Sequence, residues 1–276
     1  MTAQPIITFH DGHSIPQVGL GVWQTPADAT ASVVKAAIEA GYRHIDTASG
    51  YDNEEGVGEG IRSSGLDRKD IFVTTKLRNT DQGYDNTLRA FDGSLKKLGM
   101  DYVDLYLVHW PSKSANWGAV FETLMKLKEE GRTRAIGVAN FTTALLKIAV
   151  EDIKAPIACN QIEYHAMLDQ TKVLAYLNAR SIPLVAYCPL AQGRIASDPV
   201  LAEIGARHNA SAAQVALKWL LDQNGVAAIP KASRRESQQA NLDALKIKLD
   251  DADRKTIAAL PKDKRCVNPG FGPAWD

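Results

Sequence analysis

The chain has 276 residues, and its 32 basic and 32 acidic side chains give a formal net charge of zero. A neutral chain without long basic runs argues against nucleic acid or an anionic membrane surface as its main partner. The longest mainly apolar run, residues 182–191, is much shorter than the roughly 18 residues of a membrane-spanning helix. The N-terminus also lacks the basic start and apolar core of a secretory signal, so we expect a soluble protein of the cytoplasm.

The first predicted element is a β-hairpin, because residues 6–16 hold an Asp11-Gly12 turn between two short extended pieces. Short apolar or β-branched runs follow along the whole chain, and we interpret them as eight strands. They cover residues 17–22, 44–47, 72–76, 103–109, 135–140, 158–163, 183–190 and 226–230.

Helical patterns separate these strands. Apolar residues recur every three or four positions within 88–98 and within 120–127, which puts each set on one helical face. Gly41, Gly99 and Gly131 each stand where such a helix is expected to end. After the last strand, two more helices are predicted at 234–245 and 250–260. The tail, rich in Gly, Pro and aromatic residues, predicts an ordered loop.

Strands that are apolar on both faces, each followed by a helix, indicate parallel β-α units. Eight such units in a chain of this length favour a closed (β/α)8 barrel with the hairpin at its N-terminal mouth and an extra helix and loop at the C-terminus. An open, doubly wound sheet remains the alternative by element count. We expect a single domain over residues 1–276, and a monomer.

The C-terminal ends of the strands carry the active site in a barrel. The second, third and fourth predicted strands end in Asp46, Lys76 and His109, and Tyr51 lies in the loop after the second strand. A lysine at the end of an apolar strand is costly to bury unless it is paired, and Asp46 is its expected partner. Each residue alone also has a structural interpretation, such as a helix cap or a core histidine. Four of them together at strand ends favour a functional site.

These side chains suit one kind of chemistry. A phenol beside a lysine ammonium is expected to have a lowered pKa, because the cation favours phenolate. A nearby histidine can donate a hydrogen bond to a substrate oxygen. This predicts a general acid that protonates a developing alkoxide while a hydride is delivered. The glycines at 19–21 and 56–60 do not match G-x-G-x-x-G, so a Rossmann unit would not hold the cofactor.

No metal or hydrolase signature is visible in the sequence. Cys159, Cys188 and Cys266 are odd in number and far apart, and neither HExxH nor G-x-S-x-G occurs. We therefore expect no metal and no disulfide framework.

The sequence nonetheless resembles the aldo-keto reductase family from end to end. The matching segments are PQVGLGVW (16–23), GYRHIDTASGYDNEEGVG (41–58), VTTKL (73–77), VDLYLVHWP (103–111), IGVANF (136–141), NQIEYH (160–165) and IPKASRRES (229–237). With the ending FGPAWD, the chain is especially similar to bacterial 2,5-diketo-D-gluconate reductases. The resemblance implies an NADPH-dependent carbonyl reductase with Tyr51 as general acid, Lys76 and Asp46 as the pair that lowers its pKa, and His109 orienting the substrate.

The resemblance also implies binding residues. Asn140 and Gln161 would hold the nicotinamide carboxamide, and Tyr187 would stack on the nicotinamide ring. The other implied cofactor positions are Val22, Trp23, Pro189, Leu190, Gln192, Gly193, Lys231, Ala232, Ser233, Arg234 and Asn241. Trp23, Arg78 and Trp110 would line the substrate pocket.

Four positions depart from the family pattern. Ala139 and Ala232 replace serines, and Ser237 replaces an arginine that contacts the adenosine 2′-phosphate, so NADH is expected as a weaker alternative to NADPH. Arg78 replaces a tryptophan of the pocket. Its guanidinium either extends into solvent or pairs with a loop acid such as Asp81, or it binds an anionic substrate.

The predicted function is reduction of aldehydes and ketones, including 2-keto compounds, with 2,5-diketo-D-gluconate (reduced to 2-keto-L-gulonate) as one candidate. One alternative is a barrel lyase that forms a Schiff base through Lys76, although pairing with Asp46 keeps the lysine protonated. The other is a non-catalytic barrel that binds nicotinamide nucleotide as a regulatory module.

Overall fold

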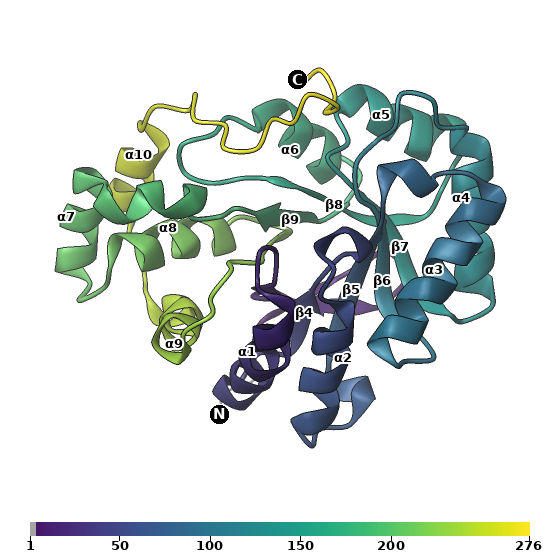
Figure 1. Ribbon diagram of the computed structural model, residues 1–276. Coiled ribbons are helices and arrows are strands. Elements are labelled where there is room, and N and C mark those ends of the chain that lie inside the picture. The colour runs from purple at the N-terminus through teal and green to yellow at the C-terminus, as the bar shows by residue number, and fades with distance from the viewer. Residues whose placement is uncertain (1–3) are drawn as a thin grey trace.

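The computed structural model describes residues 4–276 and contains eight parallel strands surrounded by helices (Figure 1). The strands are hydrogen-bonded in the order β10-β9-β8-β7-β6-β5-β4-β3, and contacts between the two edges close the sheet. Val18 bridges Ala228, and Gly21 bridges Lys231. The (β/α)8 barrel is therefore confirmed, and the open sheet is wrong. The strands are β3 (Leu20–Gly21), β4 (His44–Asp46), β5 (Phe72–Leu77), β6 (Val103–Val108), β7 (Thr133–Ala139), β8 (Ile157–Glu163), β9 (Leu184–Tyr187) and β10 (Val226–Ala228).

Helices on the outside of the barrel follow the predicted pattern. The helical stretches at 88–98 and 120–127 lie in α3 and α4, and Gly41 and Gly99 end α1 and α3 in the left-handed conformation, with φ of 118° and 62°. No helix within residues 4–276 has the length and apolar character needed to cross a bilayer. The helices are α1 (Ala27–Ala40), α2 (Glu54–Ser63), α3 (Tyr84–Leu98), α4 (Trp117–Glu129), α5 (Thr143–Lys147), α6 (Thr171–Asn178), α7 (Pro199–Arg207), α8 (Ala212–Leu221), α9 (Arg235–Asp243) and α10 (Asp251–Ala258).

The predicted hairpin closes one mouth of the barrel. Its strands β1 (Ile6–Thr8) and β2 (Ser14–Pro16) are antiparallel, and Gly12 takes a φ of +87° in the loop between them. Phe9 and Ile15 are buried in the same apolar cluster as Leu105 and Val185 of the barrel strands. The hairpin therefore caps the barrel core, and the opposite mouth is left for the site.

One predicted strand is shorter than expected. The apolar run at 183–190 forms β9 only as far as Tyr187, because the next residue, Cys188, has a φ of +52°. The chain then turns into a short 3-10 helix, Ala191–Ser197, with left-handed residues at Gln192 and Gly193. Apolar composition alone does not reveal this turn, which carries the chain away from the sheet at the site mouth.

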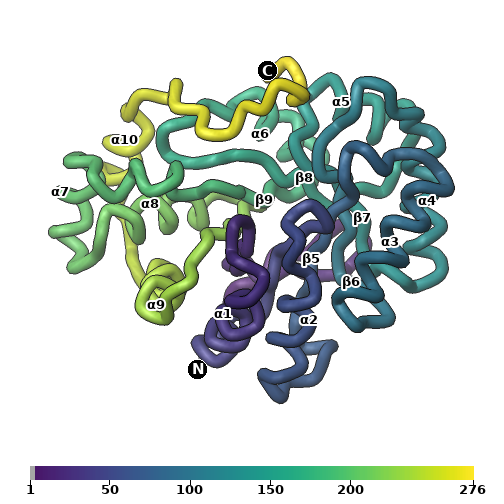
Figure 2. The backbone as a smooth tube through the Cα atoms, viewed as in Figure 1, coloured from purple at the N-terminus to yellow at the C-terminus, as the bar shows by residue number. Residues whose placement is uncertain are grey.

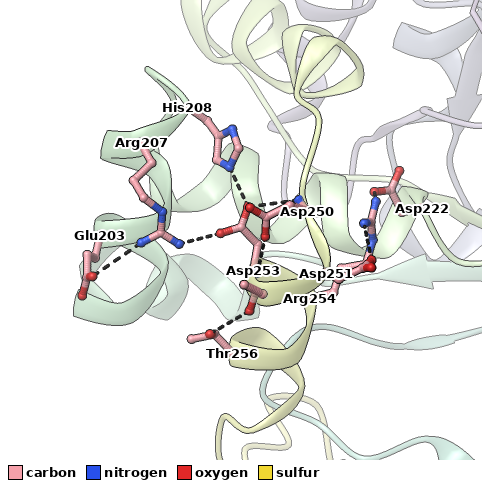
Figure 3. Close-up of polar contacts among 10 residues, drawn as sticks. Glu203, Arg207, His208, Asp222, Asp250, Asp251, Asp253, Arg254 and Thr256 are labelled. Atoms are coloured by element: carbon pink, nitrogen blue, oxygen red, sulfur yellow. Dashed lines mark hydrogen bonds and ion pairs between the residues drawn. The ribbon is translucent and has the colours of Figure 1, made fainter.

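The C-terminal segment crosses that mouth. After α10 it runs along the top of the molecule toward α5 (Figure 2), where Asp276 accepts hydrogen bonds from Thr143. The extra C-terminal helix and ordered loop are thus confirmed. At its start, α10 is tied to α7 by Asp253, which accepts hydrogen bonds from Arg207 and His208 (Figure 3).

Candidate active site

A buried ion pair lies at the centre of the open mouth. Lys76 of β5 donates from Nζ to Oδ1 of Asp46, the last residue of β4, at 2.5 Å, and both side chains are buried. The ammonium also donates to the carbonyl of Thr47 at 2.8 Å. The second carboxylate oxygen of Asp46 accepts a hydrogen bond of 2.7 Å from Gln161. The predicted pairing of Lys76 with Asp46 is therefore present.

Tyr51 and His109 complete a continuous cluster above this pair. A short 3-10 helix, Ser49–Tyr51, brings the Tyr51 hydroxyl to 3.5 Å from Lys76 Nζ. The His109 ring, just after β6, meets the Tyr51 ring edge-on, with centroids 5.4 Å apart. The structure thus brings together the four residues that the strand-end argument selected.

The pKa of Tyr51 differs in direction from the expectation. Burial raises it well above its usual range, and the negative charge of Asp46 raises it further. The prediction of a lowered phenol pKa is therefore wrong, because burial of the phenol outweighs the attraction of Lys76, whose charge Asp46 neutralises at close range. Tyr51 is a fully protonated donor at neutral pH.

His109 is uncharged for a related reason. Burial lowers the pKa of its imidazole well below the usual range, and the charges of Lys76 and Arg78 lower it further. A neutral imidazole presents one N–H donor and one acceptor. The mouth therefore offers two neutral donors, a phenol and an imidazole, beside a compensated ion pair.

The three residues expected at the nicotinamide form a chain along the same mouth. Tyr187 donates from its hydroxyl to Asn140 Oδ1 at 2.8 Å, and Asn140 donates from Nδ2 to the His109 carbonyl at 2.9 Å. Asn140 adopts a φ of +62° directly after β7. Gln161 lies in β8 and joins this group to Asp46. The hydrogen bonds link these side chains to the buried pair, although each comes from a different strand.

The remaining expected cofactor positions lie on two segments beside the mouth. One segment follows β9 and includes a buried Pro189, whereas Gln192 and Gly193 are exposed. The other follows β10, where Lys231 donates to the Gln24 carbonyl at 3.2 Å. In these segments and the first strand, the buried residues are Val22, Pro189, Ala232 and Asn241, and Leu190 is half-buried. The exposed residues are Gln192, Gly193, Lys231, Ser233 and Arg234.

Aromatic side chains form the rim expected for a substrate pocket. Trp23 is 44% exposed. Trp110 packs edge-on against Phe271 and Trp275 of the C-terminal tail, with centroid distances of 5.6 and 6.0 Å. The tail therefore packs against the segment that follows β6 and forms part of the rim.

Arg78 takes a partner other than the expected Asp81. Its guanidinium donates to Asp52 Oδ1 at 2.8 Å and to the Ser49 carbonyl at 2.7 Å. Asp52 has a φ of +54° after the 3-10 helix that carries Tyr51, which turns its carboxylate toward the rim. The Arg78 side chain is 41% exposed, so it lies at the edge of the mouth with part of its guanidinium accessible.

One supporting residue had no signal in the sequence. Gln82 donates to the Trp110 carbonyl at 2.5 Å and accepts from the Ser112 amide at 3.0 Å, which fixes the loop after β6. An isolated glutamine in a loop matches no motif, and its role becomes visible only when the loops are in place.

Comparison with known proteins agrees with this geometry. The sequence model of the Aldo/keto reductase family matches residues 17–262. The chain is 46% identical over 262 residues to an aldo-keto reductase of Mycolicibacterium smegmatis, covering 95% of each protein. It is 44% identical over 261 residues to a glyoxal reductase of Bacillus subtilis, covering 94% of each.

Solved structures show the same similarity. A putative 2,5-diketo-D-gluconic acid reductase B superposes with a TM-score of 0.92 at 38% identity, covering 95% of this chain and 94% of that one. A mutant of Gox0644 in complex with NADPH superposes with a TM-score of 0.89 at 41% identity, covering 95% and 96%. The chain belongs to the aldo/keto reductase family and is an NAD(P)H-dependent oxidoreductase.

Proposed function

We propose that this chain reduces aldehydes and ketones to alcohols, with Tyr51 as the proton donor and NADPH as the preferred cofactor. The observation that carries the proposal is the placement of the Tyr51 hydroxyl 3.5 Å from an ammonium that is buried and neutralised by Asp46. A phenol held in this way keeps its proton until a stronger base develops beside it.

Each residue of the mouth has a separate role in the proposed reaction. The nicotinamide, when bound, supplies a hydride to the carbonyl carbon. Tyr51 donates its proton to the oxygen that becomes negative, and the transfer is favourable because an alkoxide is more basic than even a phenolate of raised pKa. His109, as a neutral donor, orients the same oxygen. Lys76 stabilises the resulting phenolate at 3.5 Å, and Asp46 holds the ammonium in place.

The residues expected to hold a nicotinamide fit that group chemically. Asn140 and Gln161 are amides, and Tyr187 offers a ring beside them. Lys231 and Arg234 are exposed cations suited to a phosphate, and this favours NADPH. Alanines at 139 and 232 and a serine at 237 provide fewer polar contacts, so NADH is proposed as a weaker alternative.

Among substrates, we propose small 2-keto compounds, with 2,5-diketo-D-gluconate as one candidate that would yield 2-keto-L-gulonate. Similar proteins named as a glyoxal reductase and as a 2,5-diketo-D-gluconic acid reductase support this range. Arg78 lies at the edge of the mouth, paired with Asp52. There it would release Asp52 and bind the carboxylate of an acidic substrate instead.

A substrate panel tests the proposal. Consumption of NADPH and of NADH is followed with aldehydes, 2-keto esters, diketones and keto-sugar acids. We expect turnover of several carbonyl compounds with faster use of NADPH. No turnover across the panel, with cofactor binding intact, would favour a regulatory barrel instead.

The lyase alternative has its own test. The Lys76 ammonium donates to Asp46, Thr47 and Tyr51, which leaves no free lone pair for a Schiff base. Borohydride added with a carbonyl substrate should therefore leave the protein mass unchanged, whereas a covalent adduct at Lys76 would favour the lyase. The single domain, monomeric state and cytoplasmic location expected from the sequence stay predictions, which limited proteolysis, light scattering and cell fractionation test.

A further inference from the structure

Three side chains with metal-binding atoms meet beneath the C-terminal tail. Glu163 ends β8, Cys188 directly follows β9, and Cys266 lies in the tail. A carboxylate oxygen of Glu163 and the two sulfur atoms all lie within 4.8 Å of one another. None of the three takes part in the proton transfer proposed above. The fold therefore builds a second polar cluster, from segments 25 and 78 residues apart along the chain.

Glu163 is a buried carboxylate held by three hydrogen bonds, and the guanidinium of Arg265 lies near enough to interact with its charge but outside ion-pair distance. Its Oε1 accepts hydrogen bonds from His165 Nε2 at 3.0 Å and from the Cys266 amide at 2.6 Å, and Oε2 accepts one from the Val267 amide at 2.8 Å. Within residues 4–276, no lysine or arginine nitrogen lies within 4.0 Å of this carboxylate. A carboxylate oxygen has two lone pairs, so Oε2 keeps one for a further partner.

The fold holds these three groups facing one another. Glu163 is fixed by three hydrogen bonds, and Cys188 directly follows β9 in a left-handed turn, with a φ of +52°. Cys266 comes from the tail, and its amide is one of the donors to Glu163. The three possible ligand atoms therefore share one small space, although they come from separate segments.

We propose that a carboxylate oxygen of Glu163, Cys188 Sγ and Cys266 Sγ bind one divalent transition-metal ion of the Zn²⁺ class. Two thiolates and a carboxylate are ligands that Zn²⁺ accepts, and three protein ligands leave its fourth position open to water. On binding, each thiol releases its proton to solvent, and no electron is transferred. Thiolates on one tetrahedral zinc ion lie about 3.8 Å apart, so the two sulfur atoms need only a small adjustment.

His165 acts as a positioning residue for this site. Its Nδ1 accepts a hydrogen bond from the Met167 amide at 3.3 Å, so the ring proton lies on Nε2 and is donated to Glu163. A histidine that holds a ligating carboxylate in this way supports a metal site from outside the ligand set. Its Nε2 lies 3.9 Å from Cys266 Sγ, which places the imidazole beside the ligands.

A bound ion would join β8, β9 and the tail. Cys188 neighbours Tyr187, which we propose stacks on the nicotinamide, and the tail contributes Phe271 and Trp275 to the rim. The ion would hold the tail across the mouth and so lower turnover. Activity is a secondary readout here, because the site is detectable whether or not the reductase proposal holds.

Cobalt titration tests the site directly. Reduced protein is titrated anaerobically with Co²⁺, and we expect one equivalent to give the visible bands of tetrahedral Co²⁺ and a thiolate charge-transfer band. Addition of Zn²⁺ should remove both. Cys188→Ser and Cys266→Ser should abolish the charge-transfer signal or weaken Co²⁺ affinity at least tenfold. Cys159→Ser, which removes the third thiol in the barrel interior, is the matched control and should keep the signal.

Several outcomes would overturn the proposal. They are the absence of bands in the reduced wild-type protein, unchanged bands in Cys266→Ser, or a disulfide between Cys188 and Cys266 with no metal bound under reducing conditions. Cys266 is only half-buried in a loop, so its serine variant should keep the wild-type circular dichroism spectrum. Glu163→Gln provides a second variant, for which at least tenfold weaker Co²⁺ binding with three titratable thiols is expected.

Discussion

Two buried aspartates in this molecule hold cations in opposite ways. Asp46 and Asp253 have exposed fractions of 1% and 0%. The partner of Asp46 is Lys76, which is itself fully buried, whereas Asp253 is reached by Arg207 and His208, whose side chains are 50% and 22% exposed (Figure 3). Burial raises the pKa of Asp46 despite the attraction of Lys76. Burial alone would raise that of Asp253 too, but hydrogen bonds from His208 and Arg207 lower it.

This difference separates an ion pair that belongs to a reactive site from one that only connects two helices. Around Asp253 the side chains of Arg207 and His208 stay partly exposed to water, and their hydrogen bonds connect α10 to α7. At Asp46 both charges are removed from water, which is costly unless further hydrogen bonds compensate. Lys76 uses such bonds to Thr47 and Tyr51, and the bond to Tyr51 faces the mouth. Burial of the cation therefore distinguishes the reactive cluster.

The largest expected effect comes from removing the hydroxyl of Tyr51. Tyr51→Phe keeps the ring packing but deletes the proton donor, so kcat should fall about 100-fold or more, equivalent to about 2.7 kcal/mol. Steady-state kinetics with a good carbonyl substrate measures the loss. Tyr84→Phe, on the outer helix α3, is the control. A Tyr51→Phe enzyme within threefold of wild type would rule out the assignment.

Removing the charge of Asp253, which connects α10 to α7, should lower the stability of the protein without changing the rate of reduction. Asp253→Asn weakens the charge-assisted hydrogen bond from Arg207 and the hydrogen bond from His208, so the free energy of unfolding should fall by about 1–2 kcal/mol. Because the pKa of Asp253 is lowered on folding, its contribution is full above about pH 4 and is lost as the pH falls below that value. Urea unfolding at neutral and acidic pH checks this. A fall in kcat as large as that of Tyr51→Phe would contradict the contrast.

Arg78 offers a test at the edge of the mouth. Arg78→Trp removes a guanidinium able to bind a carboxylate in a bidentate manner. We expect kcat/KM for acidic substrates to fall about tenfold, or about 1.4 kcal/mol, while neutral aromatic aldehydes are unaffected. Parallel changes for both substrate classes would show that Arg78 only shapes the rim with Asp52.

A smaller effect is expected at the cofactor. Ser237→Arg adds a planar cation near Arg234, so NADPH should bind more tightly by about 1 kcal/mol, the scale of a charge-assisted hydrogen bond. The affinity for NADH should hardly change, because it lacks the 2′-phosphate. Fluorescence titration of both cofactors measures this. Equal tightening of both would place Ser237 away from the phosphate.

The sequence predicted the barrel well because its signals are local. Apolar strands that alternate with helices, helix-ending glycines and the turn at Gly12 depend on nearby residues. The strand-end rule placed Asp46, Lys76 and His109 on one mouth. Features that depend on tertiary contacts were missed. The direction of the Tyr51 pKa shift depends on how deeply the phenol is buried and on the negative charge of Asp46, which only the folded structure shows.

Other features were also not predicted, because they too depend on tertiary contacts. The left-handed Cys188 that ends β9 early lies inside an apolar run, where composition predicts a longer strand. The cluster of Glu163, Cys188 and Cys266 has no motif spacing, since only the folded barrel and tail bring the residues together. Pairing of Arg78 with a loop acid was one of the alternatives, and the structure gives Asp52 in place of the example Asp81, because of the turn after Tyr51.

Tyr51 remains protonated because it is buried and because Asp46 neutralises its lysine neighbour. Single-turnover rates of carbonyl reduction, measured at saturating cofactor and substrate between about pH 6 and pH 9, test it most directly. The pKa of Tyr51 lies well above this window, and that of His109 lies well below its usual value. We therefore expect the rate to stay constant across the window. A rate that falls with rising pH around an apparent pKa inside the window, and does so only when Tyr51 is present, would contradict it.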